Sequence, residues 1–264
     1  MKKGTCHICR KKSDLTFEHI PPEKAFNSSS IKLITGDELL KTIGDDSREP
    51  WDYTDLKYKQ QQRGMGLYSL CSSCNNITGK WYGQEYIRFV YTIRKLVFEN
   101  ELYNKKITGI EMKQVHVSRI GKQILSMFCS VYPGLTATYP FVKDLILNRD
   151  AVLKDFSKFR ITMFLLKEYR MGYMGITGML CGNGKLKMIA EIDAYPLGFV
   201  LELEPKDETE DVDITNFLSH TYEEKFDIKF GVNIRERNII FPTDYRTKEE
   251  IIIDTEKIEW IKKG

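Results

Sequence analysis

The stretch SLCSSCNNITGK, Ser69 to Lys80, changes its residue pattern at a pair of cysteines. Before the pair, GMGLYSLC (Gly64–Cys71) alternates apolar and polar residues and begins at glycines, which is typical of a β-strand. After the pair, apolar residues recur every three or four positions over Trp81–Val97, which predicts a long amphipathic helix. The pair formed by Cys71 and Cys74 is therefore expected to join a strand to a helix.

A second pair with the same spacing, Cys6 and Cys9, lies near the N-terminus. Two such pairs supply four thiolates to one tetrahedral Zn²⁺ in a closed structural site. The 61 residues between the pairs exceed the spacing of a compact zinc ribbon, so the fold must bring them together around an insertion. A redox-active Cys-x-x-Cys is the alternative, but neither pair lies in a βαβ pattern. With four cysteines completing the shell, His7 is expected to face solvent.

The overall composition is that of an ordinary globular protein, with 42% hydrophobic and 29% charged residues and a net charge of +3. Residues 1–114 carry 19 Lys and Arg against 14 Asp and Glu, so a polyanionic partner is expected at the front of the chain. The start MKKGTCHIC lacks the apolar run of a signal peptide, and no run is long enough for a membrane span. These features predict a cytoplasmic protein without membrane contact.

The stretch FEHIPP places Glu18 directly before His19, at the expected end of a short strand. Zinc at the cysteine pairs would bring this strand end close to Asn75 and Asn76, which follow the last cysteine. A carboxylate and an amide oxygen are ligands suited to Mg²⁺. A histidine beside that ion is suited to act as a general base, because its pKa lies near the working pH.

Taken in order, the motifs CHIC, EHIPP, LCSSCN and GK resemble those of the zinc-containing HNH endonucleases, over about residues 4–90. The resemblance implies a treble-clef zinc site with a ββα-metal hairpin, and hydrolysis of phosphodiester bonds in DNA, with RNA as an open alternative. It implies that His19 is the general base and that Glu18 and Asn75, or Asn76 one position further, hold a catalytic Mg²⁺ or Mn²⁺. It also implies a role in restriction or anti-phage defence.

The middle asparagine of that family helps to orient the base, and no asparagine occurs between Ser28 and Cys71. Gln60, Gln61, Gln62 or a backbone carbonyl are candidates to replace it. The alternative functions are a zinc-stabilised nucleic-acid-binding module without catalysis and a zinc-scaffolded protein-interaction domain.

Three basic residues flank the expected site in sequence and are candidates for phosphate contacts: Arg63, Lys80 and Arg88. The whole chain is expected to be an α+β protein in two parts. Residues 1–105 form the nuclease-like module with an insertion around 27–63. Residues 112–264, helices followed by many strands, predict an α+β domain with an antiparallel sheet. This second part is the candidate for a homodimer contact, a regulatory ligand or a protein partner.

Overall fold

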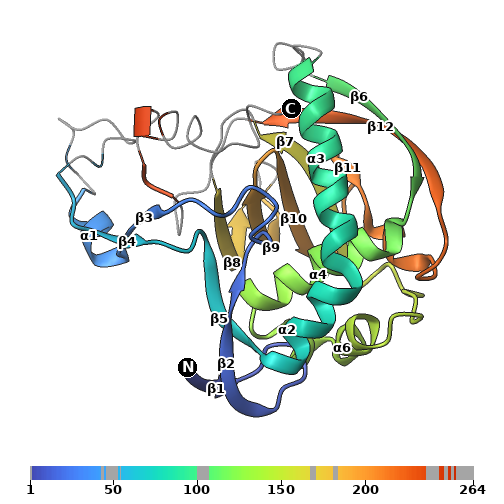
Figure 1. Cartoon of the computed structure of the whole chain (residues 1–264), viewed down its shortest axis with the longest axis horizontal. Helices are drawn as coiled ribbons and strands as arrows, with labels where there is room; N and C mark the ends of the chain where they lie inside the picture. The colour runs from blue at the N-terminus through green and yellow to red at the C-terminus, as the bar shows by residue number, and fades with distance from the viewer. Residues whose placement is uncertain are drawn as a thin grey trace.

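The computed structural model describes residues 2–42, 45, 53, 55–99, 107–166, 171–180, 184–235, 244–246, 249–250 and 253. These residues form a mixed α+β fold with three separate sheets (Figure 1). The expected α+β class is therefore confirmed. In the described part of the chain, no helix combines the length and the apolar character needed to cross a membrane.

The first sheet joins the two cysteine pairs. Its strands lie in the order β1–β2–β5 and are antiparallel. Their bounds are Lys2–Thr5 for β1, Lys12–His19 for β2 and Gly66–Cys71 for β5. The first cysteine pair occupies the turn between β1 and β2, and β5 ends at Cys71, directly before helix α2 (Ser72–Thr78). The predicted change from strand to helix at the second pair is confirmed.

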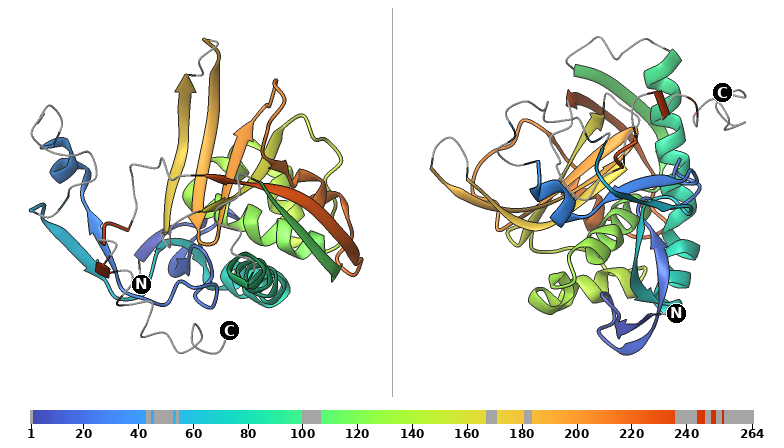
Figure 2. Two further views of the ribbon diagram at one scale, coloured as in Figure 1. Left: turned by 90° about the horizontal axis from the view of Figure 1, so that it is seen from above. Right: turned by 90° about the vertical axis from the view of Figure 1, so that its left-hand side faces the viewer.

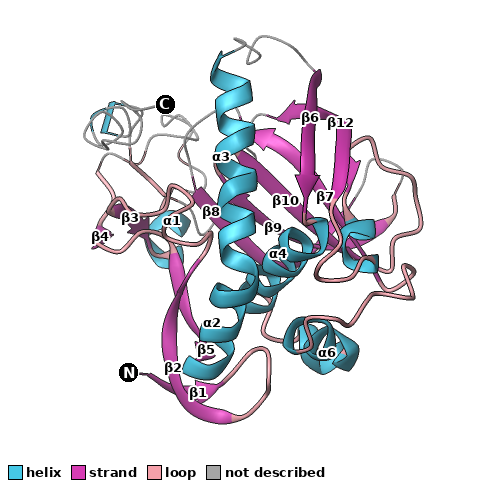
Figure 3. Ribbon diagram, turned by 45° about the vertical axis from the view of Figure 1, so that its right-hand side comes forward, coloured by secondary structure: helices cyan, strands magenta, loops and turns pink. Residues whose placement is uncertain are grey.

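A long helical run follows β5 and crosses in front of the larger sheet in Figure 3. Helix α2 continues through a π-helical turn, η1 (Gly79–Gly83), into α3 (Gln84–Glu99). The inner face of α3 carries four fully buried side chains: Tyr86, Phe89, Val90 and Ile93. The predicted amphipathic helix is confirmed, and its apolar stripe forms part of the core.

The segment between β2 and β5 contains a small sheet of its own. Strand β3 (Ile31–Ile34) pairs antiparallel with β4 (Tyr58–Gln61), and the short helix α1 (Gly36–Leu40) follows β3. This hairpin stands apart from the main body in Figure 1. A separate apolar cluster there consists of Ile34, Leu39, Leu56 and Tyr245. The stretch expected to be an insertion, residues 27–63, thus carries secondary structure.

The strands of the larger sheet lie between residues 107 and 235. Its strands lie in the order β6–β12–β7–β10–β9–β8, and β11 pairs with β7. The bounds are Ile107–Val115 (β6), Phe159–Leu166 (β7), Met171–Leu180 (β8), Leu186–Ala194 (β9), Leu197–Leu203 (β10), Val212–Asp213 (β11) and Phe226–Arg235 (β12). The described strand pairs are antiparallel except β12 and β7, which run parallel. The predicted antiparallel sheet is confirmed with this exception.

Helix α4 (Val117–Val131) lies between the two halves. Every residue of α4 except Arg119 is buried. The helix contacts α3 and β5 on one side and β8 and β9 on another. Shorter helical elements nearby are α5 (Leu135–Thr138), α6 (Pro140–Leu147) and the 3₁₀ helix η3 (Thr215–Ser219). Figure 2 shows the helices packed against the larger sheet, with the β8–β9 hairpin projecting beyond them.

Side chains from both halves pack into one apolar core. The main cluster of buried residues runs from Cys6 near the N-terminus to Val232 in β12. The predicted boundary between 105 and 112 falls partly outside the described residues, so the division into 1–105 and 112–264 stays a prediction. Because the two parts share a core, neither is expected to keep its packing without the other.

Candidate metal centre and candidate active site

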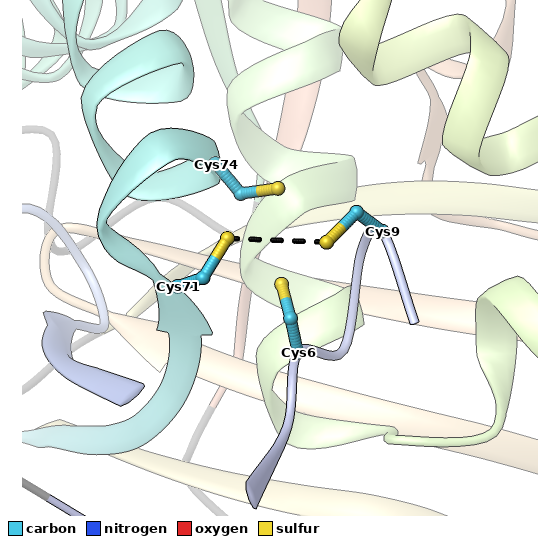
Figure 4. A group of neighbouring side chains, drawn as sticks. All are labelled: Cys6, Cys9, Cys71 and Cys74. Atoms are coloured by element: carbon cyan, nitrogen blue, oxygen red, sulfur yellow. Dashed lines mark hydrogen bonds between the residues drawn. The ribbon is translucent and has the colours of Figure 1, made fainter. Parts of the chain in front are cut away.

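The four cysteines of the two pairs lie together in one cluster. Their sulfur atoms are all within 4.8 Å of one another, and the four side chains point toward a common centre (Figure 4). The sulfur atoms of Cys9 and Cys71 are 3.9 Å apart. Four thiolates at about 2.3 Å from a tetrahedral Zn²⁺ would have their sulfurs about 3.8 Å apart. The cluster could therefore bind a metal ion such as zinc.

Two backbone turns shape this cluster. The N–H of Arg10 donates to the carbonyl of Cys6 at 2.9 Å, and Arg10 adopts a left-handed conformation with φ of 65°. Cys71 is the N-cap residue of α2, which places Cys74 in the first helical turn. The N–H of His7 donates to the carbonyl of Ser69 at 2.9 Å and so joins the two turns.

The thiols of this cluster affect one another strongly. A hydrogen bond from Cys74 lowers the pKa of Cys6 to about 4. The same interaction raises the pKa of Cys74, since a second thiolate beside the first is unfavourable. A divalent cation would remove this repulsion and let all four cysteines bind as thiolates.

Residues at and after the end of α4 form hydrogen bonds with the turn that carries the first cysteine pair. Nδ1 of His7 donates to the carbonyl of Ser130 at 3.0 Å, and the hydroxyl of Thr136 donates to the carbonyl of His7 at 2.6 Å. Ser69 and Ser130 share a hydroxyl hydrogen bond of 2.9 Å, and Arg10 donates to the carbonyl of Pro133 at 2.6 Å. The expectation that His7 faces solvent is wrong: its ring is half-buried against the end of α4.

His19 is the last residue of β2 and pairs with Gly66 of β5. Burial lowers its pKa, and this effect outweighs the charge of Glu23 and a hydrogen bond with the backbone of Arg63, both of which raise it. The ring therefore favours its neutral form at neutral pH. It packs edge-on against Phe17, with ring centroids 5.0 Å apart.

Glu18 points to the other side of β2. Successive side chains of a strand alternate, and the contact between Phe17 and His19 fixes their common side. The carboxyl group of Glu18 faces inward and is only 6% exposed. Burial raises its pKa to about 8. The structure thus does not direct Glu18 and His19 toward the same side of the strand.

The two asparagines after Cys74 differ in their surroundings. Nδ2 of Asn75 donates to the hydroxyl of Thr16 at 3.0 Å and to the carbonyl of Phe17 at 3.4 Å. Thr16 lies on the same side of β2 as Glu18, by alternation. Asn76, one position further around the helix, is exposed. Asn75 is therefore the asparagine that faces β2 beside Glu18.

The three predicted phosphate contacts also differ. Arg63 is exposed, and its charge acts on His19. Lys80 is exposed in η1. Arg88 forms an ion pair with Glu85 and donates to the carbonyl of Gln114 at 3.1 Å, which ties α3 to the end of β6. Arg63 and Lys80 are thus better placed for an external phosphate than Arg88.

A buried asparagine that sequence reasoning missed holds the loop beside His19. Asn27 is 1% exposed, and its Nδ2 donates to the carbonyls of Pro21 at 2.6 Å and Met65 at 2.7 Å. Its Oδ1 accepts from the N–H of Met65 at 2.7 Å. Gly64 has φ of 74°, and a Cβ there would come within 2.3 Å of the Asn27 carbonyl oxygen. Asn27 directly precedes Ser28 and so lies just outside the stretch in which a middle asparagine was expected.

Comparison of the chain with protein-family models, with curated proteins and with solved structures finds no match in any of the three. The function of the chain is therefore inferred from the residues of the site.

Proposed function

We propose that this chain is a zinc-stabilised endonuclease that uses a divalent cation to hydrolyse phosphodiester bonds in DNA. The observation that carries the proposal is the setting of His19, a half-buried ring at a strand end with its pKa lowered by burial. A general base must be neutral before it can accept a proton, and this setting favours the neutral form. The family resemblance extends the proposal to restriction or anti-phage defence.

The cysteine cluster supports a structural role for Zn²⁺. Four thiolates complete the shell of this ion and leave no position for a substrate. At this place the ion would tie the turn before β2 to the start of α2. It would thereby hold His19, at the far end of β2, in a fixed relation to Asn75 on the helix.

His19 would take a proton from a water molecule. The water oxygen would attack the phosphorus atom as the bond to the leaving oxygen breaks, and the leaving oxygen would gain a proton from solvent. The backbone of Arg63 raises the pKa of His19 and is therefore the group proposed to orient the ring. Of the candidates to replace the middle asparagine, a glutamine or a backbone carbonyl, we favour the backbone of Arg63.

Glu18 and Asn75 are the residues that would hold Mg²⁺ or Mn²⁺, which stabilises negative charge on the phosphate when bound. Asn75 donates from its amide nitrogen to β2, so its oxygen remains as the ligand atom. Burial favours the protonated form of Glu18 at neutral pH, and a cation bound beside it would favour the charged form that can serve as a ligand. Arg63 and Lys80 are the proposed phosphate contacts.

A nucleic-acid-binding module that does not cut is the second candidate. It is favoured by one observation: Glu18 and His19 lie on opposite sides of β2, so a cation held by the first need not serve the second. Such a module would bind DNA with a strong dependence on salt and leave it intact.

Incubation of supercoiled plasmid with Mg²⁺ or Mn²⁺ separates the two candidates. The nuclease should nick the plasmid, and His19→Ala should cut it slower by roughly 10²–10⁴-fold, the usual contribution of a general base. His220→Ala is the matched control, because this ring packs against Phe226 in the C-terminal half. Equal cutting by His19→Ala and the parent would exclude the proposed base. An uncut plasmid that binds the protein would establish the second candidate.

A further inference from the structure

The paired strands β2 and β5 carry a row of three aromatic rings on the side that faces away from α2. The row consists of Tyr68, Phe17 and His19. The ring centroids of Tyr68 and Phe17 are 5.5 Å apart, and those of Phe17 and His19 are 5.0 Å apart, both edge-to-face. The Phe17 ring lies over Gly66, where a Cβ would come within 2.7 Å of two of its carbons. Glycine at this position thus makes room for the ring that links the other two.

Tyr68 is the exposed member of this row. It is 44% exposed, although the next two residues of β5, Ser69 and Leu70, are fully buried. Ser69 has no partner in the β2–β5 register, since Thr16 pairs with Leu70 and the following residue pairs with Tyr68. Such a bulge redirects side chains, and here it turns Tyr68 outward.

Basic residues stand at both ends of the row. Lys2 is exposed and pairs with Leu15, which lies two residues before Phe17 and therefore on the same side of β2. At the other end, Arg63 is close enough for its charge to act on His19, where Glu23 is the acidic neighbour.

The segment that contains two members of the row, Phe17 and His19, is positively charged. Residues 2–24 carry six Lys and Arg against three Asp and Glu, a net charge of +3 that equals the charge of the whole protein. One of the three acids, Glu18, is buried on the other side of the strand. The surface beside His19 is thus complementary to a polyanion.

We propose that this side of the paired strands β2 and β5 binds a single strand of DNA. An unpaired base would stack on Tyr68, and Lys2 and Arg63 would hold phosphates. The inference rests on the proposed nuclease function and names the form of DNA that reaches His19. An exposed ring can stack only on a base whose face is open, and paired bases in a duplex cover one another. A positively charged surface with aromatic side chains is the usual arrangement for single-strand binding.

Binding is measured by fluorescence anisotropy with a labelled oligonucleotide of about 16 thymidines, at the upper end of single-domain site sizes. Divalent cations are left out, so that binding is read without cleavage. Tyr68→Ala should weaken the affinity between about fivefold and a hundredfold. The affinity for a duplex of the same length should stay unchanged. Lys2→Ala should reduce the slope of log affinity against log salt by about 0.7, one phosphate contact to a single strand.

Two variants control for folding and for aromatic character. Phe156→Ala removes an aromatic residue of similar exposure, 45%, from the C-terminal half and should bind like the parent. Tyr68→Trp should keep the affinity, because it keeps a stacking ring. Unchanged binding by Tyr68→Ala, or an equal loss for duplex, would overturn the inference, and tighter binding of the matching RNA would overturn its assignment to DNA. If a single-stranded oligonucleotide stays uncut with Mg²⁺ present while Tyr68→Ala loses single-strand binding, the proposed catalysis is wrong and the binding inference stands.

Discussion

The side chain of Asn27 exchanges two hydrogen bonds with the backbone of Met65, each 2.7 Å long. Met65 also accepts from the N–H of Ile20 at 3.0 Å. The segment that leaves β2 is thereby joined to the segment that enters β5. Arg63, whose backbone contacts His19, lies two residues before Met65. Asn27 is therefore a positioning residue for the candidate base.

We expect Asn27→Ala to lower the free energy of unfolding by about 3 kcal/mol, because three buried hydrogen bonds are lost. The cleavage rate should fall further than stability alone explains, since the loop that orients His19 loosens. Asn76→Ala, at an exposed position, should change stability by less than about 0.5 kcal/mol. Denaturant unfolding and plasmid cleavage measure both effects, and a fully stable Asn27→Ala would contradict this role.

Cys74→Ser should lose the metal and unfold the whole chain, not the front module alone. Structural zinc binds with about 10–16 kcal/mol, which is comparable to the total stability of a domain. The hydrogen bonds of His7 with Ser130 and Thr136 carry the loss into the C-terminal half. Elemental analysis and thermal unfolding followed by circular dichroism test this expectation.

Cys129→Ala is the control for the metal centre. Cys129 is a fully buried thiol of α4 that does not belong to the four-cysteine cluster. This variant should keep about one zinc per chain and a cooperative transition. A Cys74→Ser protein that keeps its zinc, or a Cys129→Ala protein that loses it, would show that the ligand set is wrong.

Local patterns in the sequence predicted the elements whose residues interact over short separations. The cysteine pairs, the strand before Cys71 and the helix after Cys74 follow from spacing and periodicity. The strands β3 and β4 were missed, because each is short and β4 reads YKQQ, without an apolar alternation. Asn27 was missed for a similar reason: a buried polar residue in a polar stretch has no pattern that marks it.

Contacts between distant segments could not be predicted from one sequence. His7 meets Ser130 because α4 ends beside the metal centre, and no local feature of the chain specifies that placement. Lys122 gives a second case, as a lysine that is fully buried in α4. Its ammonium group donates to three carbonyls after α6, those of Asn148, Arg149 and Ala151. Only the packed structure shows why a charge is tolerated there.

Tyr245, near the C-terminus, contacts the inserted β3–β4 hairpin, and its removal is expected to have a local effect. The N–H of Tyr245 donates to the carbonyl of Lys32 at 3.0 Å, and its ring joins the apolar cluster of Ile34, Leu39 and Leu56. Tyr245→Ala should destabilise this cluster by about 3 kcal/mol, the usual cost of truncating a buried aromatic residue.

Hydrogen exchange should reveal that effect as faster exchange in β3 and β4, with the larger sheet unchanged. Leu40→Ala is the matched control, since Leu40 lies in the same insertion but is 58% exposed. It should leave the exchange of β3 and β4 as it is in the parent. Uniformly faster exchange throughout the Tyr245→Ala protein would show that the insertion is not a separate unit of stability.

In the absence of Mg²⁺, the contribution of Glu18 to the free energy of unfolding should fall as pH rises. Burial raises the pKa of this carboxyl group from 4.5 to about 8, so the folded chain keeps a proton that the unfolded chain has lost. The stabilisation is fully present below pH 4.5 and is lost as pH rises through about 8. His7 and His19 have lowered pKa values and act in the opposite direction, but below 6.5. The cysteines also titrate between pH 6.5 and 8, but they do so equally in the parent and in Glu18→Gln, so the difference between these two proteins reports on Glu18.

Over that window the free energy of unfolding of the parent should fall by about 2 kcal/mol relative to that of Glu18→Gln, at about 1.4 kcal/mol per pH unit. Glu18→Gln is the reference because its amide cannot titrate and keeps the shape of the protonated acid. Added Mg²⁺ should stabilise the parent more at pH 8 than at pH 6.5, since the cation competes with the proton for the carboxylate. Chemical unfolding at the two pH values, with zinc retained and Mg²⁺ absent or present, measures both effects. Parallel profiles for the parent and Glu18→Gln would mean that this carboxyl group is charged in the folded protein, and an equal Mg²⁺ effect on both would remove Glu18 from the cation site.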